Sequence, residues 1–212
     1  MPVFERATAD DRDDIVKALV EGTCTNHRRL ARKRTCDEND SIRRLRKDMY
    51  SRKYDEYDHI LAGGKRNDQP VHVFVARCDG EFVGFIEVGL RKDGSGQMYS
   101  WHLAPEWRGR HMGVFMMRHA LEYFPPGVPV YSNATKNTVA ARMHGAYHFK
   151  EHKDPNPKLY REARRIPPPH INAEIASHQV PYIQTYDNRL RALEHMDTSI
   201  KVLVRAGIFL PA

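Results

Sequence analysis

Cysteine is scarce in this sequence, and its three copies do not form pairs. Cys24, Cys36 and Cys78 are scattered and odd in number among 212 residues. This usage argues against a disulfide-stabilised secreted domain and favours a reduced, cytoplasmic setting. Cys24, His27 and Cys36 lack a second close pair that would complete a zinc pattern, so no metal site is predicted.

Long apolar runs are missing as well. No stretch approaches the roughly 20 apolar residues of a membrane helix. The first residues, MPVFERATADD, lack the charged and apolar regions of a signal peptide. We therefore expect no membrane association.

Charge of one sign is concentrated in one part of the chain. The net charge is +7, and residues 27–34 with residues 43–53 hold a dense set of Arg and Lys. A solvated helix surface is the favoured interpretation, and nucleic acid is the alternative. No zinc finger, recognition helix or RNA-binding module accompanies the basic stretch, so nucleic acid is not expected as a partner.

The order of the remaining patterns predicts an α/β fold whose mixed sheet is mostly antiparallel, with helices on both faces. Residues 79–80, Asp-Gly between two apolar runs, predict a tight hairpin. Loops are expected at 22–39 and 63–68. Strands are expected at 3–8, 71–78, 82–88, 98–104 and 128–132, helices at 11–20, 41–57, 109–124 and 137–145, and a last hairpin at 147–152 and 159–166.

The C-terminal part reads as an extension. Pro167, Pro168 and Pro169 predict a stiff linker after a domain of residues 1–166. Residues 170–179 and 186–206 are helix candidates, and the second is amphipathic with Gly207 placed as its C-cap. The apolar stripe of a helical extension over 167–212 must pack against the domain, a second copy or a larger protein assembly.

The stretch from Gln97 to Gly113, QMYSWHLAPEWRGRHMG, is the most informative part of the chain. A predicted strand ends at Pro105, a turn with Gly and Arg follows, and an apolar helical pattern begins near Gly109. The first N–H groups of a helix have no partners and the helix dipole is positive there, so this arrangement can bind phosphate. Arg108 and Arg110 would add charged donors.

These residues carry a resemblance to a known family. The segment from about Val71 to Phe149 resembles the GNAT superfamily of acyl-CoA-dependent N-acyltransferases. The residues 108–113, RGRHMG, are similar to the family's Arg/Gln-x-x-Gly-x-Gly/Ala loop, and Asn137, Ala140 and Phe149 match its second pattern. The resemblance implies a GNAT-like fold with acetyl-CoA as co-substrate.

The resemblance also implies site residues. Leu103, Arg108, Gly109, Arg110, His111, Met112, Gly113 and Asn137 would bind the cofactor. His144 stands at the family's Tyr position and is expected to act as the general acid for the leaving thiolate, with a packing histidine as the alternative. His111 and His148 replace glycines of the family pattern.

The proton acceptor and the acceptor amine are less determined. Glu87, Tyr99 and His102 are candidate bases, and strand alternation predicts Tyr99, Trp101 and Leu103 on one face with His102 on the other. The basic residues 22–53 would repel a polycationic acceptor. We therefore expect a neutral or acidic small molecule, or a protein, that offers an amine.

Two hypotheses of different classes follow. The first is an N-acetyltransferase that moves an acetyl group from acetyl-CoA to a primary amine. The alternative is a catalytically inactive GNAT-fold module in a larger assembly, which the replacements at His111 and His144 and the C-terminal helices favour.

Overall fold

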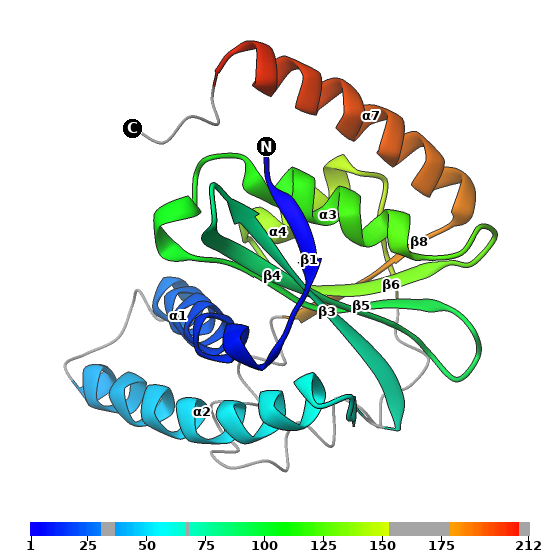
Figure 1. Ribbon diagram of the computed structural model, residues 1–212. Helices are drawn as coiled ribbons and strands as arrows, with labels where there is room; N and C mark the ends of the chain where they lie inside the picture. Colours follow the sequence, from blue (N-terminus) through cyan, green and yellow to red (C-terminus); the bar gives the residue numbers. More distant parts are fainter. Residues whose placement is uncertain (31–36, 67, 153–178, 208–212) are drawn as a thin grey trace.

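A central eight-stranded sheet separates two groups of helices (Figure 1). The computed structural model describes residues 1–30, 37–66, 68–152 and 179–207. Helices α1 and α2 cover one face of the sheet, and α3, α4 and α7 cover the other. The predicted α/β arrangement with helices on both faces is confirmed.

The sheet is mixed, with one parallel pair. Its order is β1-β3-β4-β5-β6-β8-β7, and β2 pairs with β3 outside this path. Every adjacent pair is antiparallel except β5 and β6. The strands are β1 Val3–Arg6, β2 Lys65–Arg66, β3 Gln69–Cys78, β4 Glu81–Leu90, β5 Gly96–Leu103, β6 Val130–Thr135, β7 Lys150–Glu151 and β8 Gln179–Gln184.

The helices follow the predicted order, but the first two are longer than expected. They are α1 Arg12–Leu30, α2 Asp37–Leu61, α3 Met112–Tyr123, α4 Val139–Ala146 and α7 Tyr186–Arg205. The loop predicted for residues 22–39 is wrong for residues 22–30 and 37–39, because α1 continues to Leu30 and α2 already begins at Asp37; residues 31–36 lie outside the described residues. Gly22, which suggested a break, lies inside α1 where a Cβ would collide with the His102 ring. Close packing on the sheet therefore explains this glycine.

The hairpin between β3 and β4 forms as predicted. Asp79 and Gly80 have φ of 50° and 82°. Two consecutive residues with positive φ are the pattern of a type I′ turn, which suits the twist of antiparallel strands.

The C-terminal segment supplies a strand as well as a helix. The predicted amphipathic helix is confirmed as α7, which packs on α3 through Ala192 and Met196 and an ion pair of 2.6 Å from Arg118 Nε to Asp197 Oδ1. Before it, β8 lies between β6 and β7 in the sheet. The predicted strand 159–166 and the proline linker lie outside the described residues, as does nearly all of the helix candidate 170–179. The extension predicted for residues 167–212 thus contributes a strand to the main sheet.

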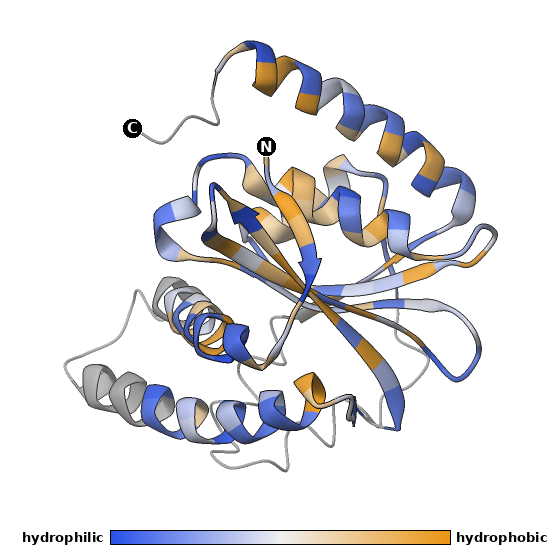
Figure 2. Cartoon of the chain, viewed as in Figure 1, coloured by the Kyte–Doolittle hydropathy of each residue, from blue (hydrophilic) through white to orange (hydrophobic). Residues whose placement is uncertain are grey.

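Two apolar layers fill the space on either side of the sheet (Figure 2). Ile15, Leu19 and Tyr57 belong to the α1/α2 layer, and Met116, Leu121 and Met196 belong to the α3/α7 layer. Each such side chain stabilises the fold by roughly 1.5–3 kcal/mol when it leaves water. These layers hold β4 and β5 rigidly, and the candidate site is built on those strands.

A β-bulge changes which residues of β5 share a face. Glu87 pairs with Ser100 but the next residue, Val88, pairs with Met98, so Tyr99 is the extra residue. Tyr99 packs in the α1/α2 layer, and Trp101 and Leu103 pack in the α3 layer. The predicted alternation that put Tyr99 beside Trp101 and Leu103 is wrong, because one inserted residue reverses the period-two pattern.

Candidate functional site

The parallel strands β5 and β6 separate soon after they begin. They pair only at Gly96 with Val130 and at Gln97 with Tyr131, and β5 then follows β4 as far as Leu103. Beyond this junction the facing backbone groups of β5 and β6 do not pair with each other in the described structure. Because the strands are parallel, the loops after both lie at the same edge of the sheet.

The loop after β5 leads into an uncapped helix N-terminus. A 3-10 turn, η2 Pro105–Trp107, precedes Gly109 with φ of 79° and His111 with φ of 58°, and α3 begins at Met112. The His111 side chain makes no capping hydrogen bond, and the first turn of α3 contains no acidic residue. Unsatisfied N–H groups with the positive end of the helix dipole form an anion site of the kind that binds phosphate.

Two arginines and a glycine shape this loop. Arg108 Nε donates to the Leu103 carbonyl oxygen over 3.1 Å, which ties the loop back to the end of β5. The Arg110 guanidinium carbon lies 5.3 Å from the centroid of the Trp107 ring. At Gly113 a Cβ would lie 3.1 Å from Met143 Sδ and 3.3 Å from the Trp101 ring, so glycine lets α3 approach α4 and β5 closely.

The structure brings the predicted cofactor-binding residues to one edge. Leu103 and residues 108–113 lie at the carboxyl end of β5, and the exposed Asn137, with φ of 62°, follows the carboxyl end of β6. The two groups therefore flank the region where β5 and β6 diverge. His111 is exposed.

His144 lies in the core and both of its ring nitrogens are engaged. Nδ1 donates to the Ala140 carbonyl over 2.7 Å, and Nε2 accepts from the Ser132 hydroxyl over 2.9 Å. The residue is fully buried, and its ring packs against the ring of Tyr182 with a centroid separation of 4.7 Å. Burial lowers the His144 pKa to about 4, so the ring is neutral near pH 7. These observations count against the predicted general-acid role and favour the packing alternative.

Glu87 and Tyr99 lie together on the α1/α2 face. Glu87 is fully buried, and its Oε1 accepts from Arg66 Nη2 over 2.8 Å. The same Arg66 nitrogen contacts Glu56 Oε1 at 2.6 Å, and the Arg66 guanidinium carbon is 5.8 Å from the centroid of the Tyr99 ring. Glu87 Oε2 and the Tyr57 hydroxyl are buried and form no well-aligned hydrogen bond in the described structure, although these two side chains interact with each other. Burial, with the nearby Glu87 charge, raises the Tyr57 pKa well above its usual value.

His102 is the third predicted base candidate, and it shares this face. Its ring packs against α1 at Gly22 and stacks on Phe85 with a centroid separation of 5.7 Å. Burial, with the positive charges of Arg108 and Lys53, lowers the His102 pKa to about 4. A neutral imidazole with so low a proton affinity is a weak base near pH 7.

Sequence reasoning missed two partners of these residues. Residues 63–68 suggested a surface loop, but Lys65 and Arg66 form β2 and the Arg66 side chain is only 21% exposed. Ser132 was also missed as the partner of His144. No local sequence pattern marks either residue. The Arg66–Glu87 contact joins segments that are distant along the chain, and the Ser132–His144 contact depends on which face of β6 carries Ser132.

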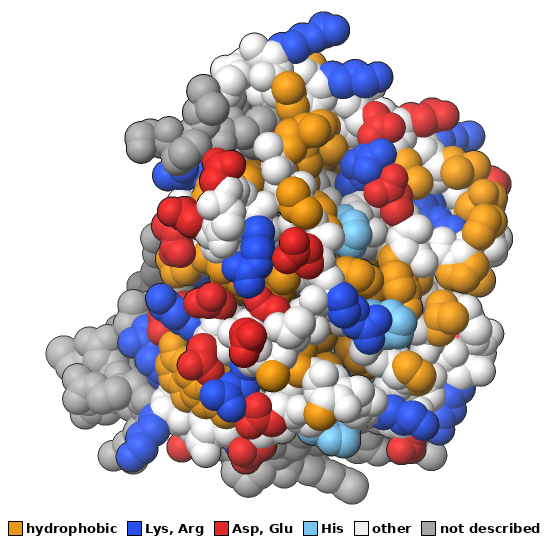
Figure 3. Space-filling model, in the orientation of Figure 1, with side chains coloured by type: hydrophobic (Ala, Val, Ile, Leu, Met, Phe, Trp, Pro, Cys, Tyr) orange, Lys and Arg blue, Asp and Glu red, His pale blue; other side chains and the backbone are white. Residues whose placement is uncertain are grey.

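Two cations in the described part of the basic stretch are paired with acids. Arg46 Nη2 lies 2.9 Å from Glu21 Oε2, and Lys53 pairs with Glu56. Figure 3 shows acidic and basic side chains interspersed on the visible face. In the described segments, no group of three His, Cys, Asp or Glu side chains is placed to hold a metal, and no helix is long and apolar enough to span a membrane.

Comparison with known proteins agrees with this geometry. Residues 39–149, just over half of the chain, match the model of the acetyltransferase (GNAT) family. The chain is 30% identical over 126 residues to an uncharacterized N-acetyltransferase of Archaeoglobus fulgidus, and the match covers 57% of this chain and 71% of that protein.

Solved structures share the fold at low identity. The PaiA N-acetyltransferase of Thermoplasma acidophilum, crystallised with coenzyme A, matches with a TM-score of 0.56 at 13% identity over 88% of this chain and 99% of that one. The N-acetylglutamate synthase of Neisseria gonorrhoeae, with coenzyme A and N-acetyl-glutamate, has a TM-score of 0.50 at 12% identity over 88% of this chain and 35% of that one. The chain belongs to the acetyltransferase (GNAT) family.

Proposed function

We propose that this chain is an N-acetyltransferase that transfers the acetyl group of acetyl-CoA to a primary amine. The separation of β5 from β6 next to the uncapped start of α3 is the observation that carries the proposal. An extended thioester arm can lie between the diverging strands while its diphosphate meets the helix N-terminus. The coenzyme A in the Thermoplasma acidophilum structure of the same fold supports this choice of donor.

The loop residues would hold the donor. The N–H groups around Gly109, Met112 and Gly113 would donate to the diphosphate, and Arg108 and Arg110 would supply positive charge. Asn137 would contact the donor from the edge of β6. Backbone N–H groups of β5 that face the gap, up to Leu103, would stabilise the oxyanion that develops on the thioester carbonyl.

The acceptor would approach from the α1/α2 face. The amine nitrogen attacks the thioester carbonyl, the C–S bond breaks, and a proton must leave the amine. We assign that proton to Glu87, whose Oε2 forms no well-aligned hydrogen bond among the described residues. Tyr99 is partly exposed above Glu87 and would contact the acceptor. We do not assign His144 as the general acid for the leaving thiolate, because its ring is neutral and both of its nitrogens are hydrogen-bonded.

One observation favours the second candidate function, an inactive module in a larger assembly. His144 is sealed in the core at the position where the family resemblance implies a general acid. Val202 and Val204 near the end of α7 are 59% and 45% exposed and are available to a partner.

The cytoplasmic setting expected from the cysteines stays a prediction.

Acetyl-CoA binding tests the proposal directly. Ligand at about 100 times its dissociation constant should stabilise the fold by about 2.7 kcal/mol, measured as a rise in Tm. His111→Asp places a negative charge at the start of α3 and should weaken acetyl-CoA binding at least about 10-fold through repulsion of the diphosphate. Calorimetric titration gives both affinities.

The chain offers a matched control. His148 is also exposed and has φ of 65°, but it follows α4 instead of preceding α3. His148→Asp makes the same change of charge in the same backbone conformation and should leave acetyl-CoA binding unchanged. Absence of acetyl-CoA binding by the unaltered protein would refute the proposal, and binding without acetylation of any amine would support the inactive module.

A further inference from the structure

The turn between β4 and β5 places a cation at the point where β5 and β6 begin to separate. Arg91 directly follows β4, and its N–H donates to the Ser95 carbonyl over 2.8 Å. Its guanidinium carbon lies 4.4 Å from the centroid of the Tyr131 ring on β6. The side chain therefore crosses the start of β5, where Gly96 and Gln97 still pair with β6.

This cation faces the acceptor side of the sheet. Val130, Ser132 and Ala134 are the buried positions of β6, and Val130 and Ala134 pack in the α3 layer. Tyr131 alternates with them and points to the other face, as Tyr99 does. Burial raises the Tyr99 pKa, and the positive charges of Arg66 and Arg91 oppose that rise.

Arg91 forms no ion pair with an acid among the described residues. Lys53 and Arg66 are balanced by Glu56 and Glu87. The acid closest in sequence, Asp93, instead accepts hydrogen bonds from the Ser95 N–H at 3.0 Å and from the Ser95 hydroxyl at 2.5 Å. The Arg91 charge also helps to lower the Asp93 pKa, but no ion pair joins the two side chains in the described structure, so the Arg91 guanidinium remains available to a ligand.

We infer that the acceptor amine carries a carboxylate and that Arg91 binds this carboxylate. The inference rests on the proposed function and names the substrate class of that site. The Tyr131 ring covers one face of the guanidinium and fixes its orientation, which leaves the N–H edge for a planar oxyanion. A carboxylate accepts two parallel N–H bonds from that edge, and a neutral amide cannot replace them. Amino acids and short peptides are the acceptors of this chemistry.

The test offers each amine in two forms, the free acid and its carboxamide, across a panel of amino acids with acetyl-CoA. Release of CoA thiol measures kcat/KM. The acid should be preferred by roughly 10- to 100-fold, the value of a hydrogen bond between charged groups. A carboxylate raises the pKa of the neighbouring amine more than a carboxamide does, so a larger share of the carboxamide's amine is unprotonated. Amine reactivity alone would therefore favour the carboxamide.

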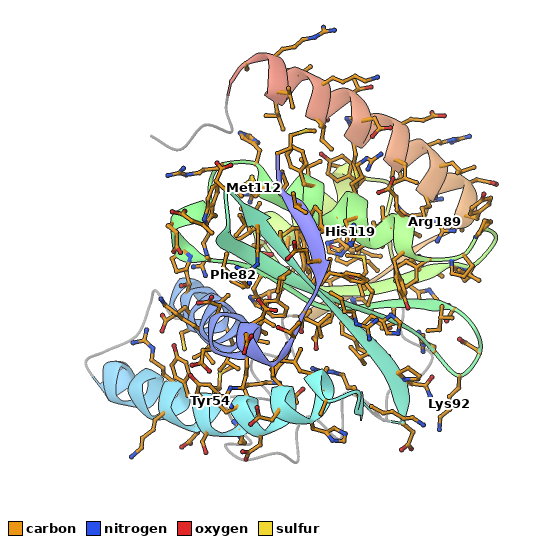
Figure 4. The ribbon with its side chains drawn as sticks, in the orientation of Figure 1. Tyr54, Phe82, Lys92, Met112, His119 and Arg189 are labelled. Atoms are coloured by element: carbon orange, nitrogen blue, oxygen red, sulfur yellow. The ribbon has the colours of Figure 1, made fainter. Side chains whose placement is uncertain are left out.

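Arg91→Met should reduce this preference to within about 2-fold, chiefly by raising KM for the acid. Lys92→Met is the matched control, because Lys92 is exposed on the same turn and its loss removes the same charge (Figure 4). The control should keep the preference. A preference that survives Arg91→Met, or that Lys92→Met also abolishes, overturns the inference.

The outcomes also separate this inference from the function on which it rests. Acetyl-CoA binding with turnover of carboxamides equal to that of acids overturns the carboxylate inference alone. Acetyl-CoA binding without turnover of either set also overturns it and leaves the donor site standing. No binding of acetyl-CoA refutes the proposed function itself.

Discussion

Acid should destabilise this fold through His144. The ring is fully buried, and its neighbours Trp101, Phe149 and Tyr182 carry no charge that could compensate a proton. Its pKa of about 4 in the fold lies below the usual histidine value of 6.5. The unfolded chain therefore binds more protons between these values, so stability is complete above about pH 6.5 and falls as the pH drops toward 4.

The size of the effect follows from the two pKa values. Between about pH 7 and about pH 4.5, the difference in proton binding by this one side chain lowers the free energy of unfolding by about 2 kcal/mol. Urea unfolding at several pH values measures it. The comparison variant is Ser132→Ala with His144→Phe, which removes the titrating ring and leaves no orphaned hydroxyl beside it.

Across this pH window the free energy of unfolding of the double variant should fall less steeply with acid, because its unfolding takes up about one proton fewer. His102, whose pKa is also lowered to about 4, supplies a remaining slope in both proteins. An identical pH dependence in the double variant and the unaltered protein would refute the conclusion that His144 is a buried neutral ring.

Other predictions concern packing, charge and catalysis. Gly22→Ala should destabilise the fold by about 1–3 kcal/mol, because the added methyl group meets the His102 ring. Gly145→Ala is the control and should be neutral or stabilising, because no neighbouring side chain lies within 4 Å of the new methyl group. Urea unfolding measures the free energy of unfolding of both variants. Arg66→Met should cost about 3–5 kcal/mol of unfolding free energy because it leaves buried Glu87 without its cation, and adding Glu87→Gln should recover part of the loss. Glu87→Gln should lower kcat at least about 100-fold while acetyl-CoA affinity, measured by calorimetry, stays unchanged; unaltered turnover would remove Glu87 from the proposed mechanism.

The sequence predicted the parts of the fold that depend on short-range patterns. The Asp79-Gly80 turn, the amphipathic α7 and the strand–turn–helix around Arg108 are each encoded within a few residues. Turn geometry and helical periodicity act locally, so they can be recognised without knowledge of the fold. The family resemblance came from the same local stretches.

Long-range packing decided the elements that were missed. Gly22 suggested a loop and lies inside α1, because the His102 ring occupies the space of a side chain. No strand was predicted at residues 179–184, and Pro181 lies within β8, which pairs with β6 and β7, although proline usually marks the edge of a sheet. Neither outcome is visible in the residues immediately around these positions.

The sequence by itself determined the family, the sheet with its two helical layers and the strand–turn–helix that is proposed to bind phosphate, because each is encoded in contiguous residues. Only the tertiary structure decided the chemistry of the individual side chains. The bulge at Tyr99 set the faces of β5, burial in the core made His144 neutral, and the approach of Arg66 to Glu87 balanced a buried charge. A side chain's protonation depends on the groups that surround it in space, and those groups come from distant parts of the chain.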